Sequence, residues 1–252
     1  YLIVHYKWEA SLLILGATAW LMGILSWNFI KDPPASPKKQ PPEPAPGGRI
    51  IEADSQKGDH EFTLSEAMHT PTFWVMFLIY VISAISFQMV VVHIVVAAVD
   101  MGIAVGAAAI ILTIIGATST LGRLTLTGLA DKIGGRTLLA LSLGLQAGAF
   151  LALARTSELV VLYIIAAVYG LMYGSIMPLM PTMTGNFFGL KWVGSIFGMM
   201  NIGYLGGAAI GPLAAGYIFD LTGSYEMAFV SAGILTLGAL LFCLRLELPR
   251  KG

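Results

Sequence analysis

One arginine stands among the long apolar segments of this sequence, and its type and position suit it for chemistry. Arg123 lies about one turn inside the end of an apolar run. A charge inside a membrane-spanning helix is costly and is functional by default. A guanidinium pairs well with a carboxylate. Two interpretations stay open: Arg123 faces a central cavity and binds a ligand carboxylate, or it reaches back to the headgroups or a nearby acidic loop.

Three other polar side chains are candidates for the same site. His93 can bind a carboxylate or relay a proton near neutral pH, and the alternative is a neutral imidazole bonded to a neighbouring helix. Tyr173 is expected to line a cavity with its hydroxyl. Asn201 is either a ligand-binding residue or part of a hydrogen bond between helices.

Composition places these residues in a lipid environment. The 252 residues are 57% hydrophobic and 11% charged, whereas soluble domains carry about a quarter charged residues. The single cysteine and four scattered histidines predict no metal site, and no cofactor is expected. We find no nucleophile–base pair and no long basic stripe, so the sequence predicts neither an enzyme nor a nucleic-acid partner.

Seven segments are apolar and long enough to span a bilayer, which needs about 20 residues. The sequence therefore predicts an all-α integral membrane protein with seven spans. Their approximate bounds are Trp8–Ile30, Pro71–Val99, Ile103–Thr127, Arg136–Ala154, Leu159–Thr184, Val193–Phe219 and Glu226–Leu244.

A polar linker separates the first span from the others. Residues 31–70 hold seven of the twelve prolines, and such a stretch is expected to be extended or disordered, with a short amphipathic turn from Phe62 to Met68. The predicted domains are thus one helix over 1–30, the linker over 31–70 and a six-helix bundle over 71–252.

Positive charge sets the expected orientation in a cell membrane. With the linker in the cytoplasm, twelve of the fourteen Lys and Arg residues fall on or near the cytoplasmic side, and only Lys7 and Arg155 fall outside it. Cytoplasmic loops carry such an excess of basic residues. The linker and the C-terminus are therefore predicted to be cytoplasmic.

Glycines recur four residues apart within the predicted spans. Small residues at this spacing let helix backbones approach closely in lipid. Either static packing or surfaces that slide during a conformational change would use them. The packing candidates are Gly194, Gly198, Gly203, Gly207 and Gly211.

The densest motif follows the third predicted span. Gly128 opens it, Asp131 and Lys132 follow, and Gly134, Gly135 and Arg136 close it. A tight turn between two antiparallel helices accounts for the two adjacent glycines, because glycine adopts backbone conformations that other residues rarely adopt. The plain alternative is a cytoplasmic turn with ordinary basic residues.

This motif resembles the cytoplasmic loop signature of the major facilitator superfamily. The resemblance implies two six-helix bundles joined by a long cytoplasmic loop, which the proline-rich linker resembles. The first span would be helix six and the others helices seven to twelve. We therefore expect the N-terminal bundle of the same protein as a partner, and Asp131 to contact it.

Other stretches are similar to bacterial monocarboxylate-transporter-like and oxalate/formate carriers. The run from Tyr169 to Pro181 and the glycine-rich run from Gly206 to Tyr225 carry this resemblance. In monocarboxylate carriers a matching helix-eight arginine is a substrate-site residue, which favours the cavity-facing interpretation of Arg123. Those carriers often have an aspartate where this chain has Ser119, and oxalate carriers a lysine that is absent from residues 193–219.

The resemblance implies a secondary transporter that moves a small organic anion by alternating access, with protons as the expected coupling ion. No Asp or Glu lies in the middle of a predicted span after the linker, so a coupling carboxylate is expected in the other bundle. The alternatives are a seven-helix sensor that binds a ligand without moving it, and a membrane-embedded enzyme, which lacks a catalytic constellation.

Overall fold

The computed structural model describes residues 10, 13–14, 16–18, 20–25 and 61–246. The chain divides into two compact units, Tyr1–Ala53 and Asp54–Gly252. In the first unit a short apolar helix runs over Gly16–Leu25. About half of the predicted span Trp8–Ile30 and residues 31–60 of the predicted linker lie outside the described residues, so both stay predictions.

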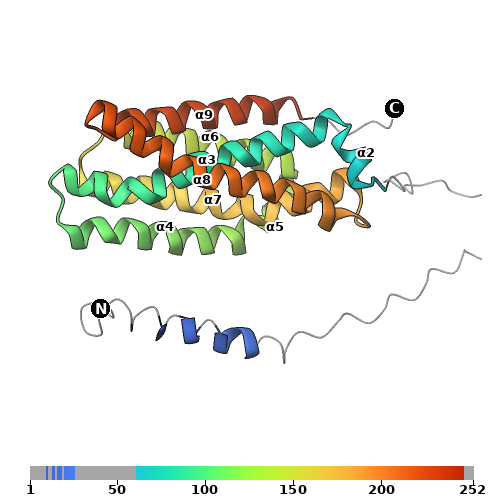
Figure 1. Ribbon diagram of the computed structural model, residues 1–252, viewed down its shortest axis with the longest axis horizontal. Helices are drawn as coiled ribbons and strands as arrows, with labels where there is room; N and C mark the ends of the chain where they lie inside the picture. The colour runs from blue at the N-terminus through green and yellow to red at the C-terminus, as the bar shows by residue number, and fades with distance from the viewer. Residues whose placement is uncertain (1–9, 11–12, 15, 19, 26–60, 247–252) are drawn as a thin grey trace, which may run out of the picture. The chain divides into compact units, whose positions relative to one another are not determined.

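The second unit contains six helices long and apolar enough to cross a bilayer, as the sequence predicted (Figure 1). At a rise of about 1.5 Å per residue, even a 19-residue helix nearly spans the roughly 30 Å hydrocarbon core. The six helices are α3 (Pro71–Asp100), α4 (Val105–Thr125), α6 (Gly135–Leu153), α7 (Leu159–Phe188), α8 (Val193–Thr222) and α9 (Glu226–Leu244).

The helix ends differ from the sequence-based bounds in a few places, because helix ends carry weak sequence signals. α7 runs to Phe188 and α8 to Thr222, and both continue through their internal prolines. The predicted loop after the third span is mostly helix, α5 (Thr127–Ile133), and the chain reverses at Gly134. Gly134 has φ +87°, so the turn rests on this one glycine.

Helices pack in three pairs, α3 with α8, α4 with α7, and α6 with α9. Glycines bring the first two pairs into backbone contact. A Cβ on Gly207 would lie 2.6 Å from the Val81 carbonyl oxygen, and a Cβ on Gly174 would lie 2.8 Å from the Ser119 carbonyl carbon. Without side chains at these points the helix axes approach closely, as lipid-embedded helices require.

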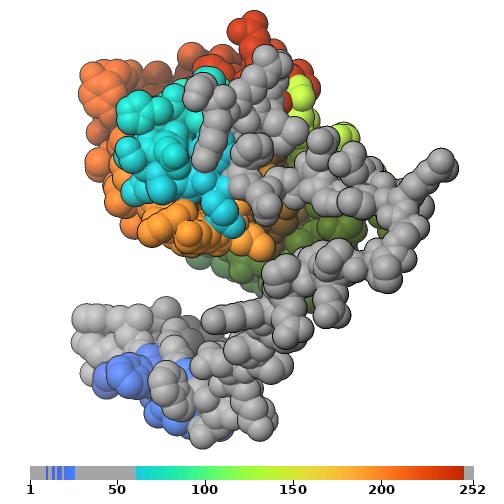
Figure 2. All heavy atoms as spheres, turned by 90° about the vertical axis from the view of Figure 1, so that its right-hand side faces the viewer, coloured from blue at the N-terminus to red at the C-terminus, as the bar shows by residue number. Residues whose placement is uncertain are grey.

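The end of the linker folds onto the bundle. α2 (Leu64–Met68) lies within the predicted amphipathic turn, and Thr63 and Glu66 form a capping box at its start. The Phe62 N–H donates to the Phe188 carbonyl (2.9 Å), and the Lys191 N–H donates to the Glu61 carboxylate (2.9 Å). In Figure 2 the cyan residues of α2 and the start of α3 accordingly lie beside the orange residues around the α7–α8 turn. Residues 61–70 thus hold the ends of α7 and α8 together.

Candidate functional site

Arg123 is an exposed residue two positions before the end of α4. Its neighbour Gly122 is buried and faces α7, where a Cβ on Gly122 would meet the Leu171 backbone at 3.0 Å. This contact fixes the rotation of α4, so Arg123 lies beside α7, and its charge is within electrostatic reach of the Tyr173 hydroxyl. The Arg123 carbonyl accepts from the Thr127 hydroxyl (2.7 Å), but its guanidinium has no hydrogen-bonding or ion-pair partner among the described residues.

Beside Arg123 lies a group of aromatic side chains that we call the aromatic seam: Tyr80, Phe87, Tyr169, Tyr173 and Tyr204. Phe87 of α3 stacks on Tyr173 of α7, with ring centroids 3.7 Å apart and planes 6° apart. The Tyr173 and Tyr204 hydroxyls are 2.7 Å apart and hydrogen-bonded. The seam therefore joins the α4–α7 pair to the α3–α8 pair.

The seam also holds polar groups whose hydrogen-bonding capacity is unused. The Tyr169 hydroxyl is buried and has no hydrogen-bond partner among the described residues. Buried hydroxyls are normally bonded, because leaving one unpaired costs about 1 to 3 kcal/mol. Asn201 is exposed on α8, three residues before Tyr204 and so on the same side of the helix. Arg123, Asn201 and the Tyr173–Tyr204 pair thus carry the hydrogen-bond donors of this region.

His93 lies elsewhere and already has partners. One ring nitrogen, Nε2, is 3.1 Å from the Pro212 carbonyl, and the other, Nδ1, is 3.3 Å from the Tyr225 hydroxyl. A neutral imidazole satisfies both contacts, with Nε2–H donating to the carbonyl and Nδ1 accepting from the hydroxyl. This arrangement matches the interpretation of His93 as a residue that links helices.

Tyr225 lies in the α8–α9 turn, outside the spanning helices. Burial raises its pKa, and the nearby carboxylates of Asp100 and Asp220 raise it further. Its hydroxyl therefore stays protonated at neutral pH and is available to donate to His93.

The charged loop motif spreads over α5 and the start of α6. Asp131 and Lys132 are exposed on α5, and Gly128 has open space where its Cβ would be. The Arg136 guanidinium donates to the Leu244 carbonyl at the end of α9, where a positive charge is favourable. In return, the Cys243 thiol contacts the Arg136 carbonyl at 3.7 Å. Arg136 therefore ties α6 to α9, a role that its place in the motif did not indicate.

The predicted packing glycines of α8 fall into two groups. Gly203, Gly207 and Gly211 lie against α3, where a Cβ would collide with the Phe77 ring or with the backbone. Gly194 and Gly198 have no described atom within 4 Å of an added Cβ. The first group thus holds the α3–α8 pair together, and the second leaves the start of α8 open.

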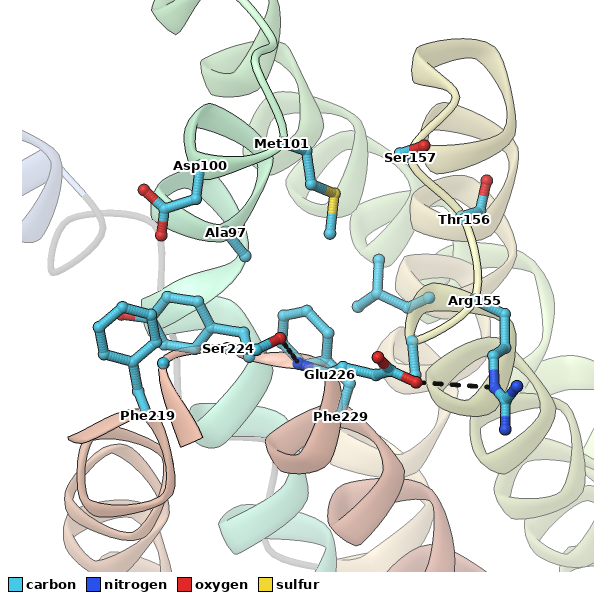
Figure 3. A pocket seen from close by; sticks show the side chains of 14 residues that line it. Ala97, Asp100, Met101, Arg155, Thr156, Ser157, Phe219, Ser224, Glu226 and Phe229 are labelled. Carbon is cyan, nitrogen blue, oxygen red and sulfur yellow. Dashed lines mark hydrogen bonds and ion pairs between the residues drawn. The ribbon is translucent and has the colours of Figure 1, made fainter. Parts of the chain in front are cut away.

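A cavity of about 450 Å³ lies at the end of the bundle where α3 ends and α9 begins. Figure 3 shows Asp100, Phe219 and Phe229 around it, with Arg155 beside Glu226. The Arg155–Glu226 pair is exposed and 3.9 Å apart, and such pairs contribute little stability. α4 begins at this end and carries Arg123 near its other end, so the cavity is separate from the aromatic seam.

The sequence predicts Arg123, Tyr173 and Asn201 as ligand-binding residues, which stays a prediction, but it did not point to Tyr80 or Phe87. Tyr80 and Phe87 are seven residues apart and Tyr169 and Tyr173 four apart, so each pair shares one helix face. That spacing was the available signal. It does not indicate that the two faces meet, because this depends on the glycine contacts between helices.

Comparison with known proteins indicates one protein family. The family model described as Major Facilitator Superfamily matches residues 1–204 and, overlapping, 76–252. Monocarboxylate transporter 12-B of Danio rerio is 23% identical over 269 residues, covering 99% of this chain and 56% of that protein. The chain therefore spans little more than half of this relative.

Solved structures share the fold. The peptide transporter POT in complex with sulfate superimposes with a TM-score of 0.63 at 19% identity, over 70% of this chain and 38% of the transporter. A point mutant of the same transporter gives the same values. Both the family and these neighbours are transport proteins, in agreement with the prediction that the chain is not an enzyme, and they do not favour a sensor. With the matched residues covering the whole chain, this multi-pass membrane protein belongs to the Major Facilitator Superfamily.

Proposed function

We propose that the whole protein is a secondary transporter that moves a small organic anion by alternating access. The observation that carries this proposal is Arg123, an exposed guanidinium on a spanning helix with no partner among the described residues. An unpaired charge at membrane depth is costly, and a bound anion would offset that cost.

The chemistry of the site favours a single carboxylate. Arg123 offers paired N–H donors in a planar fork that matches a carboxylate. Asn201 and the hydroxyls of Tyr173 and Tyr204 offer further donors nearby. One cation matches one carboxylate better than two, which favours a monocarboxylate over a dicarboxylate such as oxalate. The relative named as a monocarboxylate transporter supports the same class, and we propose the bacterial carrier branch on the sequence motifs alone.

The proposed transport cycle needs the other bundle of the family fold. In this scheme the face with Arg123 meets that bundle across a central cavity, which opens to each side of the membrane in turn. The linker and the C-terminus would lie in the cytoplasm, following the distribution of basic residues. The acidic side chains described on α3–α9 lie at helix ends or on α5. A coupled proton, if one is carried, is therefore proposed to bind outside α3–α9.

The test is uptake by the full-length protein in lipid vesicles. We would measure labelled lactate, pyruvate, formate and oxalate, each with and without a pH gradient. Saturable uptake of a monocarboxylate, stimulated by an inward proton gradient, is the expected result. Arg123→Ala should raise KM about a hundredfold, because a charge-assisted hydrogen-bond pair contributes on the order of 3 kcal/mol.

Two variants serve as controls. Arg155→Ala removes an exposed arginine at the other end of the bundle and should leave uptake unchanged. Arg123→Lys keeps the charge but loses the planar fork, so a partial loss is expected. Unchanged uptake in Arg123→Ala would remove the proposed role of this residue, and no uptake of any anion by well-inserted protein would refute the anion class.

A further inference from the structure

Besides the Arg123 guanidinium, the candidate site has the aromatic rings of the seam. α3 and α7 do not come into close backbone contact, and the space between them holds the rings of the seam. Phe87 spans both tyrosines of α7, with its centroid 3.7 Å from the Tyr173 ring and 6.1 Å from the Tyr169 ring. Tyr80 and Tyr204 form a second contact, with centroids 4.7 Å apart.

Part of this aromatic surface remains accessible. Tyr80, Tyr169 and Tyr173 are buried, whereas Phe87 and Tyr204 are half-buried. The accessible rings therefore come from α3 and α8, and the free guanidinium comes from α4. Gly174, next to Tyr173, meets the backbone of Ser119, one turn before Arg123, so we place a ligand that reaches Arg123 with its carboxylate near the rings of the seam.

We propose that the carboxylate bound by Arg123 belongs to a molecule with a flat aromatic body, which stacks against the accessible parts of Phe87 and Tyr204. This inference rests on the proposed function and narrows its substrate class. Aromatic rings pair in offset-stacked or edge-to-face arrangements, and such pairs add up to about 1.5 kcal/mol beyond burial of the same area. Small aliphatic acids would use the arginine alone.

The unused hydroxyl of Tyr169 belongs to the same argument. A seam that served only to pack the bundle would gain by replacing Tyr169 with phenylalanine, because an unpaired buried hydroxyl lowers stability. The ring centroid of Tyr169 lies 6.1 Å from that of Phe87 and 6.3 Å from that of Tyr173, so the unpaired hydroxyl belongs to the same group of rings.

The experiment compares three acids that differ only in the group attached to a common 2-hydroxy acid. Lactate carries a methyl group, mandelate a phenyl ring and hexahydromandelate a saturated ring of the same carbon count. Uptake is measured with the full-length protein in vesicles, normalised to inserted protein. We expect the KM of mandelate to be about tenfold below that of hexahydromandelate, and that of lactate to be higher than both.

Variants separate ring stacking from general packing. Phe87→Leu removes the ring but keeps an apolar side chain, so the ratio of the hexahydromandelate KM to the mandelate KM should fall to about one. Phe242→Leu makes the same change at an exposed position on α9 and should retain the preference.

Each outcome decides the inference. Equal KM values for mandelate and hexahydromandelate in the unaltered protein would overturn it, and this comparison needs no variant to fold. If lactate is then still carried in an Arg123-dependent way, the proposed anion transport stands and only the aromatic class fails. Uptake of none of the three acids would overturn both.

Discussion

Replacing Gly174 with alanine is the sharpest test of how the bundle is held together. A Cβ at this position would lie 2.8 Å from the Ser119 carbonyl carbon and Cα, and closer still to its carbonyl oxygen. These are backbone atoms of α4, so no side-chain rotation relieves the overlap. The two helices must move apart along the stretch where Gly122 and Gly170 also bring them together.

The cost follows from two opposing effects. Alanine stabilises an unhindered helix by about 1 kcal/mol relative to glycine. Overpacking of a close contact costs about 1 to 3 kcal/mol, and more where the backbone must shift. Gly148→Ala is the matched control, because nothing described lies within 4 Å of an added Cβ on α6. Because the gain from alanine applies to both variants, we expect them to differ by the overpacking cost, about 1 to 3 kcal/mol, with Gly174→Ala the less stable.

The measurement is the thermal unfolding of each full-length variant in detergent, followed by loss of monodisperse protein. Gly148→Ala should unfold at or slightly above the temperature of the parent, and Gly174→Ala several degrees below it. Equal unfolding temperatures for the two variants would refute the close backbone contact between α4 and α7.

Three further predictions follow from the same structure. Gly134→Ala should cost about 1 to 3 kcal/mol, because φ is +87° there, whereas Gly135→Ala meets only the ends of the Met183 and Leu179 side chains and should cost less; thermal unfolding compares them. His93→Phe should lower stability while changing the KM of transported anions less than threefold, since the imidazole bonds to Pro212 and Tyr225; a large rise in KM would restore a ligand-binding role. Tyr225 should ionise above pH 10, so the tyrosinate absorbance that is missing from a Tyr225→Phe titration should be the part that appears above pH 10 in the parent protein. The contribution of this hydroxyl to the free energy of unfolding should be complete below pH 10 and should fall as the pH rises through the raised pKa.

The six spans were predictable from sequence because lipid demands long, unbroken apolar helices, and few other structures satisfy that demand. The structure of the loop motif was harder to predict. Its residues look like a turn by glycine content, yet residues 127–133 form α5, and the reversal needs only Gly134. Local composition indicates where a chain bends but not how few residues the bend requires.

The residues of the candidate site likewise differ in how clearly the sequence indicates them. Arg123 was recognisable because a lone cation in an apolar helix stands out at any position. Phe87 did not stand out, since aromatic residues are common in apolar helices. His93 seemed available for a ligand, but its partners Pro212, in α8, and Tyr225, in the α8–α9 turn, lie more than a hundred residues further along the chain. Long-range contacts of this kind follow from helix packing, which no local pattern encodes.

The packing of the bundle explains why the site lies where it does. Glycine contacts join α4 to α7 and α3 to α8 through backbone atoms, and such contacts allow little adjustment. Between the two pairs lie the rings of the seam and the Tyr173–Tyr204 hydroxyl bond, and α3 also approaches α4 closely. Arg123 belongs to the first pair, and Phe87, Asn201 and Tyr204 to the second. A ligand held by both pairs in the proposed way would therefore depend on the position of one pair relative to the other.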